Sequence, residues 1–295
     1  MLSTAEKIFY VLSALTSVGF AVVTFTRMVR VILRGQGRLF AAPFVRRAGE
    51  GIAAFLSQGG MMLRRPVTSA FHAIIVLGFL YYLLANVGDL VEGFLPGFRF
   101  LADNQLGGPY RIVGDFLSAG VIVAMAFFLV RRFLTRSTDL SFPVQVQLHP
   151  RAERGIKTDS FLVGVFILGH VGSRFLGATF SLSLTGQDVW QPIASIVASS
   201  WVGLSATSLA VGERICWWVS QGLILAFIPY FPYSKHAHLF MGPLNYFTRP
   251  ERASPGALQV IDFDAEGVEQ FGASRLTDLS RTQIVDAFAC VMCNR

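Results

Sequence analysis

Charged residues are scarce in this sequence. Of its 295 residues only 15% are Asp, Glu, Lys or Arg, whereas 53% are hydrophobic, and the mean hydropathy is +0.54. Because soluble globular domains carry about 25% charged residues, this composition excludes an ordinary soluble protein and predicts a membrane protein. The net charge of +7 does not indicate nucleic-acid binding, since the arginines gather between apolar runs.

Cysteine is also rare, with three residues in the chain. Cys216 lies in an apolar run, while Cys290 and Cys293 form a C-x2-C pair in a polar tail, so a disulfide framework of the secreted kind is excluded. A cleavable signal is not expected either. The first apolar run lacks a small-residue cleavage site and continues directly into arginines.

Five apolar runs are each long enough to cross the hydrocarbon core of a membrane. They cover residues 8–33, 66–91, 110–134, 160–184 and 212–231. The segment 185–210 is too polar for a crossing, and its Trp190 and Trp201 suit an interfacial position on the outer face. The sequence therefore predicts an all-α membrane protein built as a five-helix transmembrane bundle.

The arginines predict the orientation of this bundle. The loops after the first and third runs are rich in basic residues, and the other connections are not. By the positive-inside rule these two loops are cytoplasmic and the N-terminus lies outside. Five crossings then place the C-terminus in the cytoplasm, with a short tail after residue 245.

Histidines occur at positions where an ionisable side chain is costly and usually serves a ligand, a proton path or an ion pair. His72 lies early in the second run, and His236 and His238 directly follow the fifth. All three are expected near the cytoplasmic side, at a similar depth. Two imidazoles from different helices can bind the iron of haem b from opposite faces. We therefore predict His72 and His238 as haem ligands, with His236 as the alternative to His238.

The remaining histidines are less specific. His170 in the fourth run either serves a second haem or bonds a neighbouring hydroxyl or carbonyl group. His149, in a polar loop, is expected to be solvated. The non-haem interpretation makes His72 a bundle contact and His238 a membrane-surface residue. If a haem is present, Lys235 is expected to pair with one of its propionates.

Two sequence strings carry a family resemblance. FHAIIVLGF (residues 71–79) in the second run and PYSKHAHL (residues 232–239) after the fifth resemble the cytochrome b subunit of respiratory nitrate reductase. The two strings resemble more closely those relatives of this subunit that are fused to heterodisulfide-reductase-like iron-sulfur modules. This group includes electron-transfer-flavoprotein:menaquinone oxidoreductases. The resemblance covers residues 1 to about 245, and the tail resembles the start of the fused module.

The resemblance implies that His72 and His238 hold one haem b on the cytoplasmic side. A second pair of ligands would fall at Tyr82 and Ser220, which are not usual haem ligands, so a second haem is left open. The resemblance also implies a multi-pass protein of the bacterial cytoplasmic membrane, surrounded by lipid. Menaquinone is then the substrate and electron-transfer flavoprotein a partner.

The tail carries a second cofactor signal. Cys290 and Cys293 fit the first two positions of the ferredoxin pattern C-x2-C-x2-C-x3-C-P, whose third cysteine would fall just past Arg295. We expect the start of a domain that holds a 4Fe-4S cluster, with zinc or no metal as alternatives. The predicted division is a transmembrane cytochrome b domain (1–245), a cytoplasmic linker (246–285) and the beginning of a ferredoxin-like iron-sulfur domain (286–295).

Together these features predict an electron-transfer module that links the menaquinone pool through haem b to cytoplasmic iron-sulfur centres. It would be the membrane part of a quinone-linked iron-sulfur oxidoreductase, which needs its iron-sulfur domain or subunit for catalysis. The alternative is a non-redox transporter or anchor that uses histidines to move protons. Transporters are commonly built from internal repeats, and neither histidine segment is repeated in the sequence.

Overall fold

The computed structural model describes residues 2–39, 44–57, 62–101, 105–135, 140, 148–248, 263–264 and 272–290. Within these ranges the regular structure is helical, and one isolated bridge pairs Gln36 with Ser280. The long helices are α1 (Thr4–Leu33), α4 (Pro66–Phe94), α5 (Gly107–Leu129), α6 (Pro150–Thr185) and α8 (Ala206–Tyr230). Five helices are long and apolar enough to span a membrane, which confirms the predicted all-α five-helix bundle.

Shorter helices complete the chain. The α-helical ones are α2 (Phe44–Ser57), α7 (Pro192–Ala198), α9 (His238–Thr248) and α10 (Arg281–Ala289). The 3-10 turns are η3 (Ser199–Trp201), η4 (Phe231–Tyr233), η5 (Lys235–Ala237) and η6 (Leu276–Asp278), and α5 continues into the π-helical turn η1 (Val130–Leu134). The predicted interfacial segment 185–210 thus contains the short helix α7 and does not form a sixth span.

Two long helices, α6 and α8, begin six residues or more before their apolar runs. α6 starts at Pro150 because His149 caps it, its Nδ1 accepting the backbone N–H of Arg151 at 3.2 Å. His149 is exposed, as expected, but it has this capping role. α8 starts at Ala206, where Ser205 Oγ accepts the N–H of Ser208 at 3.1 Å. Capped polar turns therefore extend both helices beyond their apolar parts.

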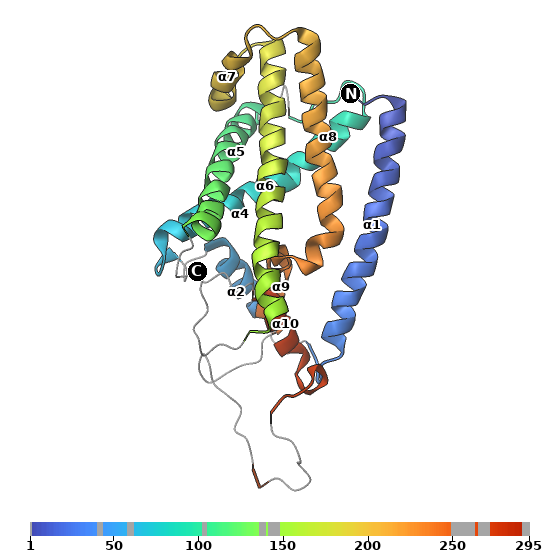
Figure 1. Cartoon of the computed structure of the whole chain (residues 1–295), viewed down its shortest axis with the longest axis vertical. Coiled ribbons are helices and arrows are strands. Elements are labelled where there is room, and N and C mark those ends of the chain that lie inside the picture. The colour runs from blue at the N-terminus through green and yellow to red at the C-terminus, as the bar shows by residue number, and fades with distance from the viewer. Residues whose placement is uncertain are drawn as a thin grey trace. The chain divides into compact units, whose positions relative to one another are not determined.

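The chain forms two compact units. The described part of unit 1 lies within Met1–Phe20 and Gly60–Tyr230, and that of unit 2 lies within Ala21–Gly59 and Phe231–Met292. Unit 1 contains α4, α5, α6, α7 and α8 with the first part of α1. In Figure 1, α6 runs beside both α5 and α8. The functional division predicted at residues 245 and 285 stays a prediction.

Small residues let the helices of unit 1 approach closely. Its buried core includes Tyr82, Val121 and Val171, from α4, α5 and α6. A Cβ atom at Gly114 would collide with the Tyr81 side chain, so only glycine fits at that crossing. Asp115 of α5 holds α7, because its carboxylate accepts the first backbone N–H groups of that helix.

Unit 2 packs the described part of the tail against other elements. A core cluster joins Met28 and Ile32 of α1, Met241 of α9, and Ile284 and Val285 of α10. The backbone N–H of Gln36 also donates to Leu279 at 2.9 Å, and its carbonyl accepts from Arg281 at 3.0 Å. Residues 276–285, which the sequence assigns to a linker, therefore contain a 3-10 turn and most of a packed helix.

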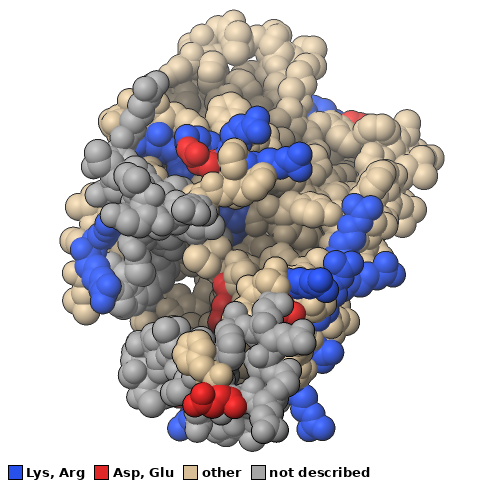
Figure 2. Space-filling view, turned by 60° about the horizontal axis from the view of Figure 1, so that its bottom comes forward, with Lys and Arg blue, Asp and Glu red and all other residues tan. Residues whose placement is uncertain are grey.

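Basic side chains lie at the ends of the long helices that the sequence predicts to be cytoplasmic. They include Arg27 and Arg30 near the end of α1, and Arg131 and Arg132 in η1. In the space-filling view of Figure 2, Lys and Arg side chains are more frequent than Asp and Glu side chains. The orientation in the membrane stays a prediction based on this charge pattern.

Candidate functional site

The two histidines after α8 lie in unit 2. Ser234 caps η5 by accepting the N–H of His236 at 3.2 Å, and α9 begins at His238. Nδ1 of His238 bonds the backbone carbonyl of Lys235, which can only accept, so Nδ1 carries the proton. The Nε2 atom is then the basic nitrogen. A metal-binding histidine is commonly held in this way by a carbonyl group.

His236 is also a neutral imidazole. Burial, with smaller contributions from His238 and Lys235, lowers the pKa of His236 to about 3. Aromatic rings surround this stretch: the Phe231 ring lies 6.1 Å from the His236 ring and 5.4 Å from the Phe240 ring. His236 is therefore in the neutral state that a metal ligand requires, in apolar surroundings of the kind that a haem needs.

His72 lies in unit 1, in the second turn of α4, where it is half-buried. The preceding residue, Phe71, stacks on Phe127 of α5 with ring centres 4.3 Å apart. Because His72 and His238 belong to different units, their pairing around one iron rests on the sequence and stays a prediction.

The cysteine pair is described only in part. Cys290 follows the last turn of α10, donates its backbone N–H to Asp286 at 3.0 Å and is exposed. Cys293 lies outside the described residues. Among the residues that the structure does describe, no three His, Cys, Asp or Glu side chains are grouped to hold a metal ion. The iron-sulfur ligation stays a prediction.

His170 is buried at the contact of α6 with α8. Its Nδ1 lies 3.0 Å from Ser220 Oγ and 3.2 Å from the Ser220 carbonyl, and its Nε2 lies 3.4 Å from Nδ2 of Asn86. Both ring nitrogens thus face hydrogen-bonding groups of the protein. This is the arrangement expected if His170 bonds a neighbouring hydroxyl or carbonyl group. Haem ligation by His170 stays an expectation, and it would require one of these contacts to be given up.

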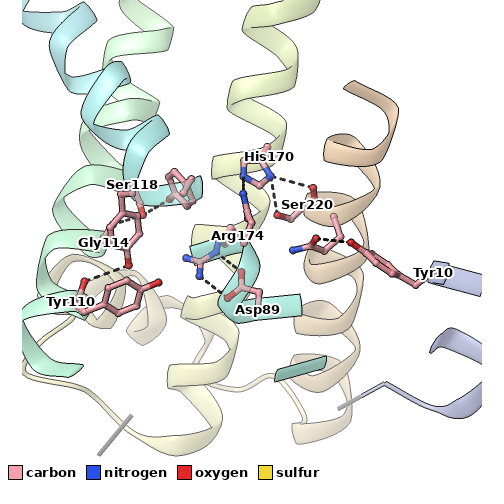
Figure 3. Close-up of polar contacts among 12 residues, drawn as sticks. Tyr10, Asp89, Tyr110, Gly114, Ser118, His170, Arg174 and Ser220 are labelled. Carbon is pink, nitrogen blue, oxygen red and sulfur yellow. Dashed lines mark hydrogen bonds and ion pairs between the residues drawn. The ribbon is translucent and has the colours of Figure 1, made fainter. Parts of the chain in front are cut away.

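An ion pair lies one turn from His170. Arg174 of α6 donates to both carboxylate oxygens of Asp89 on α4, at 2.6 and 2.7 Å, and its guanidinium lies 5.4 Å from the centre of the Tyr82 ring. Figure 3 shows Arg174 between His170 and Asp89. The sequence analysis did not predict this pair. The available signal was the presence of ionisable residues in helices of membrane-spanning length.

Tyr82 and Ser220, the positions expected for a second pair of haem ligands, are both buried. The Tyr82 hydroxyl donates to Ser118 Oγ at 2.7 Å, and Ser118 in turn donates to the Gly114 carbonyl at 2.5 Å. Tyr82 thus bonds a side chain of the neighbouring helix α5, and Ser220 bonds His170 of α6. Whether these positions hold a second haem stays the open question that the sequence raised.

The chain is similar in sequence to two proteins that are named as oxidoreductases. It is 30% identical over 237 residues to the probable iron-sulfur-binding oxidoreductase FadF of Bacillus subtilis, over 79% of this chain and 31% of that protein. It is 22% identical over 244 residues to the EtfAB:quinone oxidoreductase of Syntrophomonas wolfei, over 79% of this chain and 32% of that protein. The chain thus spans about a third of the length of these relatives. No protein-family model and no solved structure matches it.

Both relatives are named as oxidoreductases, one iron-sulfur-binding and the other acting on quinone. This supports the oxidoreductase context that the sequence resemblance predicts. Neither name mentions a haem or nitrate reductase, so the cytochrome b part of that resemblance stays a prediction.

Proposed function

We propose that this chain is the membrane part of a quinone-linked iron-sulfur oxidoreductase of the bacterial cytoplasmic membrane. In this role it exchanges electrons between menaquinone and iron-sulfur centres on the cytoplasmic side through a b-type haem. The observation that carries the proposal is the similarity of 79% of the chain to a quinone oxidoreductase and to an iron-sulfur-binding oxidoreductase. The five apolar helices add the membrane setting that a lipid-soluble quinone requires.

His72 and His238 are the proposed haem ligands, with His236 as the fallback for His238. The Nδ1 contact of His238 supports its assignment, because a metal-binding histidine is commonly oriented by a backbone carbonyl such as that of Lys235. Lys235 then offers a cation to a haem propionate. The bound haem would supply one-electron transfer, and the protein residues would hold it and exclude water from it.

Cys290 and Cys293 are the proposed first two thiolate ligands of a 4Fe-4S cluster. The exposed position of Cys290, just after α10, supports this assignment, because a cluster completed by another domain or subunit needs an accessible thiol. Electron-transfer flavoprotein is the proposed soluble partner. The name of the relative from Syntrophomonas wolfei supports that choice.

The absorbance spectrum of the purified chain tests the haem assignment. A reduced-minus-oxidised low-spin b-type spectrum is expected in the wild type, and it should be lost in His72→Ala and in His238→Ala. The matched control is His149→Ala, since His149 is an exposed helix cap outside both candidate segments.

Loss of the spectrum in His236→Ala with retention in His238→Ala would reassign the ligand. A chain that folds and shows no Soret band in any preparation would overturn the proposal. That outcome would favour the non-redox transporter or anchor.

A further inference from the structure

A pocket of about 1210 Å³ lies within unit 1 and is lined by residues of α4, α5, α6 and α8. Part of its wall is aromatic. Tyr81 and Tyr110 are stacked with ring centres 5.0 Å apart, and Trp217 of α8 also lines the pocket. Ligand pockets commonly combine such apolar and aromatic walls with a few polar groups that orient the ligand.

Three of the four arginines that line this pocket have acidic partners, and the fourth is Arg99. The nitrogen-to-oxygen distances are 2.6 Å from Arg174 to Asp89, 2.7 Å from Arg111 to Asp188 and 3.0 Å from Arg214 to Glu6. The lining also contains Glu92, Asp115 and Glu213, so with Asp89 and Asp188 its five carboxylates outnumber its four arginines. The charge distribution therefore favours an uncharged ligand.

One donor in the pocket wall has no partner. Gln221 of α8 is 2% exposed, and its Oε1 accepts a hydrogen bond from the Tyr10 hydroxyl at 3.3 Å. Within the part of the chain that the structure describes, its Nε2 has no hydrogen-bond partner. Buried donors are nearly always satisfied in folded proteins, so this N–H indicates a ligand that brings an acceptor oxygen.

We infer that this pocket binds the headgroup of a quinone, with Gln221 Nε2 donating to a ring carbonyl oxygen and the aromatic wall covering the flat ring. This inference rests on the proposed function for its choice of ligand class. A quinone is uncharged and planar, and its polar atoms are carbonyl oxygens, so it meets each of the three conditions.

Two further features fit this ligand. Leu184 and Val211 line the pocket and are 39% and 52% exposed, so they offer an apolar route for an isoprenoid tail towards lipid. Tyr81 lies nine residues along α4 from His72, which corresponds to about 14 Å of helix rise. The pocket wall therefore begins at a moderate distance, along one rigid helix, from a proposed haem ligand.

The first test measures binding of menadione, which has the headgroup of menaquinone, to the purified full chain in lipid nanodiscs. Quenching of tryptophan fluorescence reports the affinity. Gln221→Leu and Gln221→Met, which both lack the donor, should weaken binding about tenfold, the effect of one well-placed hydrogen bond. The control is Thr16→Val on α1. Thr16 is exposed, and its hydroxyl donates to the Leu12 carbonyl of the same helix.

Unchanged menadione affinity in both Gln221 variants would overturn the inference. Melting temperatures of all variants identify any that fail to fold. If Gln221→Leu misfolds, the methionine variant, which has nearly the volume of glutamine, carries the test.

A second measurement separates this inference from the proposed function. Reduced menadione is mixed with each variant, and the rate of haem reduction is followed by absorbance. Slower haem reduction in the Gln221 variants, with an unchanged haem spectrum, supports both the quinone pocket and the proposed function. Weakened binding in a protein that holds no haem leaves the pocket assignment standing and refutes the proposed function. Equal affinity and equal reduction rates in all variants refute the pocket and leave the function standing.

Discussion

Replacement of Asp89 by asparagine should destabilise unit 1 strongly. The change removes the charge that balances Arg174, while the guanidinium keeps its place between α4 and α6. Breaking a fully buried ion pair costs about 3–5 kcal/mol, and breaking an exposed one costs about 0–1 kcal/mol. Each side chain of this pair is 24% exposed, and the bidentate geometry is close to ideal. We therefore expect a loss of about 3 kcal/mol in the free energy of unfolding.

Reversible unfolding of the purified chain by denaturant in mixed micelles provides the assay. A double-mutant cycle with Arg174→Gln isolates the interaction, and the double variant should be more stable than Asp89→Asn alone because no unpaired charge remains. The matched control is the ion pair of Lys157 with Glu153. Its nitrogen-to-oxygen distance is 2.9 Å, but its side chains are 66% and 52% exposed. Its disruption should cost far less than that of the Asp89–Arg174 pair, because exposed pairs contribute little to stability.

A loss below about 1 kcal/mol in Asp89→Asn would refute this reasoning, because it would mean that the pair contributes no more than a surface contact. A coupling energy near zero in the cycle would lead to the same conclusion.

Three other predictions address the rest of the chain. Asp115→Ala should lower the free energy of unfolding by about 1–2 kcal/mol, because this carboxylate accepts the N–H groups of Ile193 at 2.7 Å and Ala194 at 3.0 Å at the start of α7. Amide exchange should become faster at both residues, and unchanged exchange would contradict the prediction. Haem extraction should return about one haem per chain, because Tyr82 and Ser220 stand where a second ligand pair is expected; two haems, one of them lost in His170→Ala, would show that α6 supplies a ligand. Cysteines introduced at Arg46 and Arg151 should react with an impermeant reagent only in permeabilised cells, and reaction in intact cells would overturn the topology.

The fold was predictable because hydropathy in a membrane protein directly reports the spans. Both early helix starts escaped prediction, since His149 and Ser205 cap turns that are polar and extend beyond the apolar runs. Likewise, the polar composition of the tail concealed Ile284 and Val285. Their burial depends on contacts with Met28 and Ile32, about 250 residues earlier in the chain.

The candidate site was predictable only where single residues carry the signal. A histidine beside an apolar run stands out by itself, as His238 does. The Asp89–Arg174 pair joins residues 85 positions apart, and one sequence does not reveal which acid meets which base. Gln221 shows no local pattern either. Its significance comes from an amide N–H that has no partner in the folded bundle.

Reduction of the haem by a quinol is the most direct measurement of the central claim. The full chain, joined to the iron-sulfur domain that is proposed to complete it, is mixed with reduced menadione, and haem absorbance and cluster signals are followed together. The account predicts that the quinol reduces the haem in the wild type and that electrons fail to reach the cluster in His72→Ala. A wild-type haem that the quinol never reduces, with equal cluster reduction in His72→Ala, would contradict it.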